Sequence, residues 1–288
     1  MSHSSRRSLA SLRARYTGES SCAAALGVAR GAGSIGLDHC TSAQRRLRFL
    51  LALGMLNEGL WQAWPGEWAV HGIVRYELVI APQNEHLAFV CATPYNAVRW
   101  LVTTGPEGTV RRLPGLRLEE QIGDTYRLRH LPTGATMSVT AQSSTRPDSD
   151  SGHEVRDRRM WRTDTPLNDA ERDSLADLPS AGPASEALLA GLLVRLCLQD
   201  PGRAWAVGTF FDDPLNREKA LLPGAVSRRL WGNGTRWELE WSSYPDEEDL
   251  VSALTDPVAG LSGAKAAKVR RGWDITFDDA LLALRPRR

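Results

Sequence analysis

Two stretches of the chain follow the same pattern: RYELVIAPQNEHLAFVCATP (residues 75–94) and RWELEWSSYPDEEDLVSALTDP (residues 236–257). Both begin with Arg, an aromatic residue, Glu and Leu, and both continue through a proline, a Glu and a Leu to a second proline. The first four residues of one stretch therefore align with those of the other. With a short insertion, the prolines also align: Pro82 with Pro245, and Pro94 with Pro257.

The similarity continues on both sides of these stretches. Upstream, each has an apolar helical run, a Pro-Gly pair and a Trp-Ala-Val triplet, at residues 68–70 and 205–207. Downstream, residues 126–139 and 273–284 each read as two alternating strands joined by a turn. Matches in the same order indicate an internal repeat. We therefore predict two units, residues 42–140 and 184–288, with a basic helical arm at 1–41 and a linker with a short helix at 141–183.

Each unit is predicted to have the order α-β-β-α-β-β-β. Thr41 and Gln44 form a capping-box pattern at the start of the first helix. A strand through Trp-Ala-Val, a second alternating strand, and a helix starting at Pro82 or Pro245 follow. Three strands close each unit, at 116–122, 126–130 and 136–139, and at 265–270, 273–277 and 281–284. Strands in runs indicate an α+β fold, here a tandem duplication with antiparallel sheets (a pseudo-dimer) preceded by a helical N-terminal segment.

The N-terminal segment is basic and is predicted to form two helices, Ser8–Tyr16 and Glu19–Arg30, in a helix-turn-helix outline. Residues 1–48 contain eight arginines against Glu19 and Asp38, although the whole chain has a net charge of +1. Such a segment is either a docking surface for an anionic partner or a solvated helix face. The candidate nucleic-acid contacts are Arg6, Arg7, Arg13, Arg15, Arg45, Arg46 and Arg48.

The sequence contains no GxSxG, HExxH, P-loop or GxGxxG motif, and its six histidines and four cysteines are scattered. We therefore expect no catalytic constellation, metal or cofactor. The best enzymatic candidate combines Asp212 and Asp213 with Glu238 and Glu240, a layout that resembles restriction-endonuclease-like nucleases. The lysine which that family places two residues after its acid is absent. Glu238 and Glu240 equally fit the solvent face of an amphipathic strand.

Ten tryptophans are present, and those at repeat positions are expected to pack the sheets against their helices. Outside the repeat, Trp61, Trp64 and Trp161 are candidates for contact with a partner. No apolar run reaches the length of a membrane span, so we expect no membrane partner. The sequence thus predicts a non-enzymatic binding or adaptor protein of the bacterial cytoplasm, with a protein or nucleic-acid partner. The alternatives are a divalent-metal-dependent nuclease or hydrolase, and a protein-binding chaperone or structural component.

Overall fold

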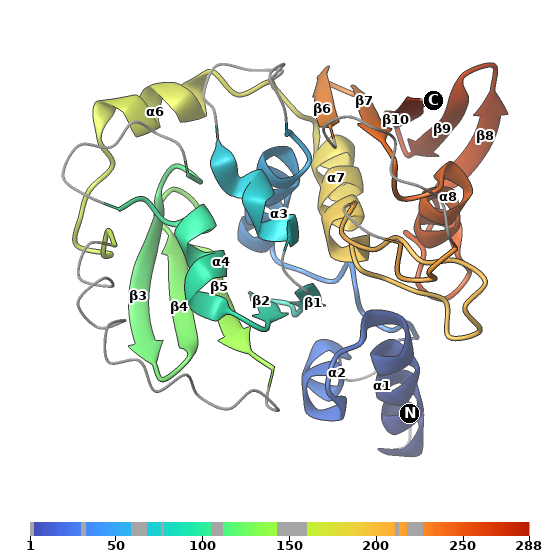
Figure 1. Cartoon of the computed structure of the whole chain (residues 1–288), viewed down its shortest axis with the longest axis horizontal. Coiled ribbons are helices and arrows are strands. Elements are labelled where there is room, and N and C mark those ends of the chain that lie inside the picture. Colours follow the sequence, from blue (N-terminus) through green and yellow to red (C-terminus); the bar gives the residue numbers. More distant parts are fainter. Residues whose placement is uncertain are drawn as a thin grey trace.

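The predicted duplication is confirmed by the element order of the computed structural model (Figure 1). The structure describes residues 3–29, 33–58, 68–75, 78–104, 112–142, 160–210, 213–217 and 227–287. Unit one contains α3 (Ser42–Met55), β1 (Leu78–Pro82), β2 (His86–Cys91), α4 (Pro94–Leu101), β3 (Leu116–Ile122), β4 (Thr125–His130) and β5 (Thr136–Ala141). Unit two contains α7 (Pro183–Arg195), β6 (Arg228–Asn233), β7 (Arg236–Ser242), α8 (Glu247–Thr255), β8 (Lys265–Val269), β9 (Gly272–Phe277) and β10 (Ala280–Arg287).

Each unit has one five-stranded sheet, and the two sheets have the same topology. The strand orders are β1-β2-β5-β4-β3 and β6-β7-β10-β9-β8. The hairpin partners are antiparallel as predicted, but β2 and β5 are parallel, and so are β7 and β10. Both sheets are therefore mixed rather than fully antiparallel, because the last strand of each unit returns to the middle of the sheet beside the second.

The alignment of residues 75–94 with residues 236–257, made from the sequence, matches the wrong strands of the two sheets. Leu239 pairs with Leu230 across β7 and β6 in the way that Phe89 pairs with Ile80 across β2 and β1. The counterpart of β7 is therefore β2, whereas the aligned residues of unit one lead into β1. Alternation is common to both strands of a hairpin, so it does not distinguish one from the other.

Two predicted elements of unit one change with this correction. Pro82 ends β1 instead of starting a helix, and the helix starts at Pro94, in the place that Pro245 holds before α8. The predicted strand through Trp-Ala-Val is also wrong, since η1 (Ala69–Arg75) is a 3₁₀ helix. The three closing strands of each unit lie within a few residues of their predicted ranges.

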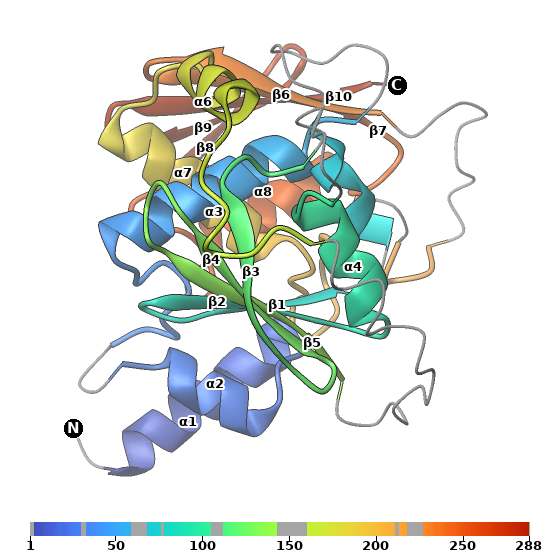
Figure 2. The same ribbon diagram turned by 90° about the vertical axis from the view of Figure 1, so that its left-hand side faces the viewer.

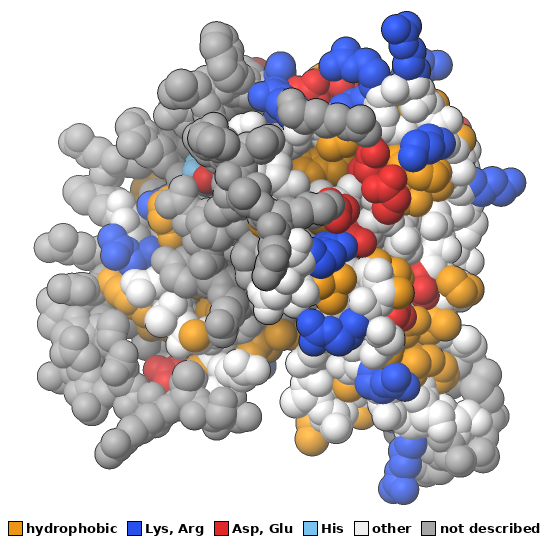
Figure 3. Space-filling model, turned by 45° about the vertical axis from the view of Figure 1, so that its right-hand side comes forward, with side chains coloured by type: hydrophobic (Ala, Val, Ile, Leu, Met, Phe, Trp, Pro, Cys, Tyr) orange, Lys and Arg blue, Asp and Glu red, His pale blue; other side chains and the backbone are white. Residues whose placement is uncertain are grey.

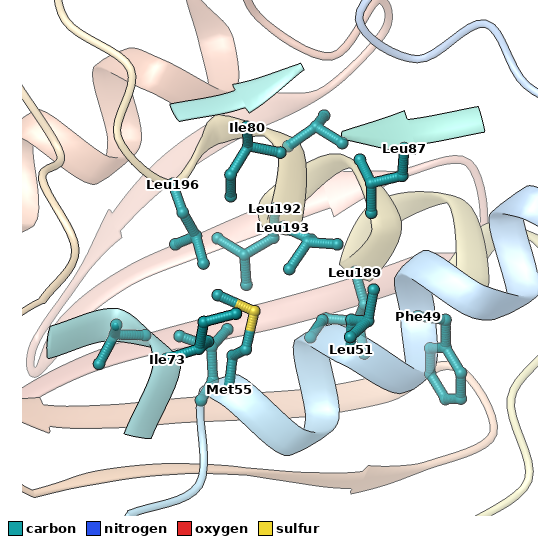
Figure 4. Packing of buried hydrophobic residues seen from close by; sticks show 14 of the residues in the cluster. Phe49, Leu51, Met55, Ile73, Ile80, Leu87, Leu189, Leu192, Leu193 and Leu196 are labelled. Carbon is teal, nitrogen blue, oxygen red and sulfur yellow. The ribbon is translucent and has the colours of Figure 1, made fainter. Parts of the chain in front are cut away.

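The two sheets enclose a layer of helices, so the molecule has a single large core. We call the sheet of unit one sheet one and the sheet of unit two sheet two. Figure 2 shows sheet two, the helices and sheet one as successive layers. Helices α3 and α7 pack against each other at the centre, and Figure 4 shows Leu51 and Met55 of α3 beside Leu189 and Leu193 of α7. Buried side chains of both units belong to one cluster. The units therefore depend on each other for their apolar contacts.

The segment after α3 ties unit one directly to the sheet of unit two. The Asn57 side chain donates to the Leu230 carbonyl at 2.9 Å and accepts from the Leu230 amide at 3.0 Å. The Glu58 amide donates to the Arg228 carbonyl at 2.8 Å, and the side chains of these two residues form a buried ion pair. Residues 57 and 58 thus pair with β6, the edge strand of sheet two.

The N-terminal arm is the helical hairpin that the sequence predicts. It consists of α1 (His3–Thr17) and α2 (Ser21–Gly27), joined through Gly18, whose φ of 73° suits glycine. The arm packs beside β1 (Figure 2). The predicted linker helix is α6 (Asp169–Ala176), with a capping box between Asn168 and Glu171. No helix in the described ranges is long and apolar enough to cross a bilayer.

Candidate functional site

Two of the seven candidate arginines are buried. Arg13 forms an ion pair with Glu19 at 2.8 Å and donates to the Ile35 carbonyl, and neither charged side chain is exposed. Arg48, 1% exposed, donates to the carbonyls of Leu37 and Gln83. Neither side chain is therefore exposed to a partner in this structure, a fact that their charge in the sequence does not reveal, and their contact with nucleic acid stays a prediction. Both join the chain before α3 to the first unit.

The other five arginines differ in their surroundings. Arg6 donates to two carbonyls at the end of α2, and Arg46 forms an ion pair with Glu186 at 2.6 Å. Arg7 and Arg15 are exposed, and Arg45 is half-buried. On the face shown in Figure 3, basic side chains lie beside acidic, polar and apolar ones. The basic segment is thus in part a set of structural contacts within the chain.

The acidic residues of unit two lie in two different environments. Asp212 is outside the described residues, and Asp213 is buried against Arg217, whose Nε donates at 2.8 Å. Arg217 also contacts Asp249 at 2.6 Å and Asp246 at 3.3 Å at the start of α8. The hydrogen bond from Arg217 lowers the pKa of Asp213 to about 2. This carboxylate is therefore held by a cation of the chain itself.

Glu238 and Glu240 lie on the outer face of sheet two. They alternate along β7 with Trp237, Leu239 and Trp241, which are buried in the core. Glu240 forms an ion pair with Arg287 at 2.6 Å. The three described acidic candidates therefore do not converge, since Asp213 is beside α8 on the core side of the sheet. Within the described part of the chain, no group of three or more His, Cys, Asp or Glu side chains is placed to hold a metal ion.

Of the three tryptophans predicted to contact a partner, the structure describes only one. Trp61 and Trp64 lie outside the described residues. Trp161 is half-buried, with the Arg117 guanidinium 4.8 Å from its ring centre. Among the repeat-position tryptophans, Trp68 and Trp205 are buried.

A concave site lies in unit one, where the arm meets one end of the sheet. It is an open groove of about 1020 Å³. Leu26 of α2 stands on its rim, 68% exposed. The walls come from the start of α3, the β1–β2 turn, β4 and the β4–β5 loop: Thr41, Ala43, Gln44, Gln83, Asn84, Glu85, His86, Arg127, Thr133, Gly134, Ala135 and Thr136. A second groove of about 560 Å³ adjoins it on the outer sheet face and shares His86, Arg127 and Thr136.

The groove depends on residues that unit two does not share. The β4–β5 loop has five residues, 131–135, where the β9–β10 turn has only two, 278 and 279. Gln44 at the third position of α3 donates to the carbonyls of Glu85 at 2.9 Å and Thr136 at 2.6 Å. Its counterpart, Ser185 of α7, reaches only the Gly234 carbonyl. The predicted capping box is therefore half-formed: Thr41 accepts from the Gln44 amide, but the Gln44 side chain turns to the sheet.

In unit two, an extended segment of the chain lies against the equivalent turn. The Gly234 amide donates to the Ser180 carbonyl at 2.8 Å, and the Gly182 amide donates to the Gly234 carbonyl at 3.4 Å. Ser180 also donates to the Asn233 side chain at 2.6 Å. In unit one the Thr41 amide likewise donates to the Asn84 carbonyl at 3.0 Å, so in both units the chain before the first helix is bonded to this turn.

His86 is the functional candidate that the sequence analysis did not identify. Its Nδ1 is 3.1 Å from Thr136 Oγ1 and its Nε2 is 2.9 Å from Ser138 Oγ. Burial, and then the charge of Arg127, lower the pKa of His86 below its ordinary value near 6.5. The imidazole is therefore neutral at pH 7. Only the parallel pairing of β2 with β5 brings these residues together, and the sequence pattern did not reveal that pairing.

Comparison of the chain with protein-family models, with curated proteins and with solved structures found no match. Its function must therefore be inferred from the geometry of these sites.

Proposed function

We propose that this protein is a binding or adaptor protein that holds a segment of polypeptide in the groove of unit one. The observation that carries the proposal is the groove itself, which is open and polar. Part of its lining differs from the corresponding residues of unit two, where Ser185 replaces Gln44 and the loop before the last strand is shorter. Since duplicated units share what the fold requires, the features of one unit alone are the better candidates for function. The chaperone alternative would use the same groove.

The lining of the groove suits a polypeptide better than a small molecule or a polyanion. Small-molecule sites are mostly enclosed and apolar, with a few polar groups. Here the walls offer amide and hydroxyl donors together with carbonyl acceptors, which match the alternating groups of a peptide backbone. The lining contains one acidic residue, Glu85, beside Arg127, and Arg127 forms an ion pair with Glu120 at 3.1 Å, so the groove has no strong preference for anions. Leu26 supplies an exposed apolar contact of the kind that anchors a bound segment.

The second unit supports the same class of ligand. Its residues 180–182 are an extended stretch of backbone bonded to the turn that corresponds to the β1–β2 turn of unit one. This end of the sheet is thus able to accept main-chain hydrogen bonds from an extended segment. A peptide in the groove of unit one would use a neighbouring surface of the same architecture.

Nucleic acid is the second candidate, supported by the exposed arginines of the arm. Arg7 and Arg15 are exposed on α1, and Arg45 is half-buried. Phosphate contacts by Arg release counterions, so such binding weakens steeply with salt. With Arg13 and Arg48 buried, fewer cations are available than the sequence suggested.

Peptides selected by phage display on the full-length protein would test the proposal. We expect selected peptides to lose binding to Leu26→Asp by roughly tenfold or more, because a charge replaces an apolar contact of the order of 1–3 kcal/mol. Ile122→Asp is the matched control, since Ile122 is also an exposed apolar side chain (59%) but lies outside the groove. Equal loss for both variants, or no selected peptide at all, would refute the groove as the binding site.

Binding of mixed single- and double-stranded oligonucleotides, measured over a series of salt concentrations, distinguishes the nucleic-acid alternative from peptide binding. Binding that falls with salt and is lost in the triple variant Arg7→Gln, Arg15→Gln, Arg45→Gln would support that alternative. Peptide binding should persist in the triple variant.

A further inference from the structure

The outer face of sheet one places Ser138 at the centre of a small polar cluster. On β5, Ser138 pairs with Ala88 of β2 on one side and with Arg127 of β4 on the other. Residues opposite each other in a sheet point to the same face, so these three side chains are neighbours. Ala88 contributes only a methyl group. Ser138 is 8% exposed, and His86 and Arg127 beside it line the adjoining grooves. Met137 and Val139, which flank Ser138 in sequence, point into the core.

A chain of hydrogen bonds orients His86 toward this serine. Thr136 Oγ1 donates to the Glu85 carbonyl at 3.2 Å, so its lone pairs are left to accept the Nδ1–H of His86. The Nε2 of His86 then carries a lone pair and accepts the Ser138 hydroxyl proton at 2.9 Å. A base held by a second group, within hydrogen-bond reach of a hydroxyl, is the arrangement that activates serine nucleophiles.

We propose that Ser138 is a nucleophile, activated by His86 and held in register by Thr136, that accepts acyl groups from esters bound on the outer face of sheet one. In this assignment Ser138 and His86 are the catalytic residues and Thr136 is a positioning residue. Arg127 lies opposite Ser138 on β4, is exposed, and forms an ion pair with Glu120 at 3.1 Å. In this assignment it supplies the positive charge that a developing oxyanion requires. The site adjoins the binding groove through His86, Arg127 and Thr136.

The chemistry is that of ester hydrolysis in two steps. Ser138 Oγ attacks the acyl carbon while its proton passes to His86 Nε2. The bond from the acyl carbon to the leaving oxygen then breaks, and that oxygen takes the proton from His86, releasing an alcohol. Water attacks the acyl-serine in the second step by the same proton route, which releases a carboxylic acid and restores Ser138.

Unit two contains no equivalent of this cluster. From the strand pairing, the counterparts of His86, Thr136 and Ser138 are Arg236, Leu281 and Ala283. The cluster therefore belongs to the features that distinguish the units and is not required by the shared fold.

An alkyl fluorophosphonate probe tests the nucleophile directly on the full-length protein. Reaction forms a bond from Ser138 Oγ to phosphorus, expels fluoride and leaves the proton on His86. We expect mass spectrometry of the labelled protein to find the adduct on Ser138. Labelling should be absent in Ser138→Ala and slowed about a hundredfold in His86→Gln, since a general base typically contributes 10²–10⁴-fold.

Thr140→Ala is the matched control, because Thr140 lies on the same strand and face but bonds to Thr125 instead of His86. It should label at the wild-type rate. No labelling of the wild type, an adduct at another residue, or undiminished labelling of folded His86→Gln would overturn the proposal. The mapping of the adduct on the wild type does not depend on whether the variants fold. The probe also reports independently of peptide binding, so failure of one proposal is distinguishable from failure of the other.

Discussion

Replacing Glu171 by Gln should destabilise the fold strongly. Glu171 in α6 accepts from Arg117 Nη1 at 2.8 Å and Nη2 at 2.6 Å, and from the Gly115 amide at 2.8 Å. The side chains of the pair are 0% and 1% exposed. Removal of one charge from such a pair leaves an uncompensated buried ion, at a cost of about 3–5 kcal/mol. The thermal midpoint should then fall by roughly 6–20 °C, at about 2–4 °C per kcal/mol.

The control is Asp169→Asn on the same helix. Asp169 pairs with Arg172, but these side chains are 90% and 55% exposed. Loss of an exposed pair should cost about 1 kcal/mol or less. Urea denaturation followed by circular dichroism measures both variants, and a Glu171→Gln cost no larger than that of the control would refute the reasoning. The double variant Arg117→Met, Glu171→Leu should recover much of the loss if the penalty comes from the unpaired charge.

Two further predictions concern pH and packing. Burial lowers the pKa of His130 to about 4, so the unfolded chain takes up the proton first, and stability should fall by roughly 3 kcal/mol from pH 7 to pH 4. Urea midpoints across this range should show a smaller slope for His130→Gln, and an unchanged slope would contradict the assignment. Gly54→Ala should destabilise by about 1–3 kcal/mol despite the better helix propensity of alanine, because its Cβ would lie 2.9 Å from Val70 Cβ in the core. If the melting temperature of Gly54→Ala equalled or exceeded that of the wild type, α3 would be able to move away from Val70 at little cost, which would contradict the prediction.

Much of the fold could be predicted because its elements have local signals. The Asn233–Gly234 turn between β6 and β7, the proline before α8 and the closing strands are each defined by a few adjacent residues. The register of the repeat could not be predicted in the same way. Whether Leu239 corresponds to Leu78 or to Phe89 depends on which strands pair, and both choices satisfy the same alternation.

The candidate sites were harder to predict than the fold because they depend on burial and on contacts between distant residues. Arg13 and Arg15 look alike in sequence, yet one is buried against Glu19 and the other is exposed. His86 and Ser138 are far apart in the chain, and only the parallel β2–β5 pairing brings them to 2.9 Å. Charge counts and motif searches do not contain this information.

The pairing of Asn57 and Glu58 with β6 also bears on aggregation. An edge strand with unpaired main-chain groups is a template for strand addition by another molecule. Here a segment of unit one occupies part of that edge, through backbone and side-chain bonds to Arg228 and Leu230. Unit two on its own would expose this edge together with the apolar side of α7. The first half of the chain therefore shields the second half from self-association, a role separate from any ligand that it binds.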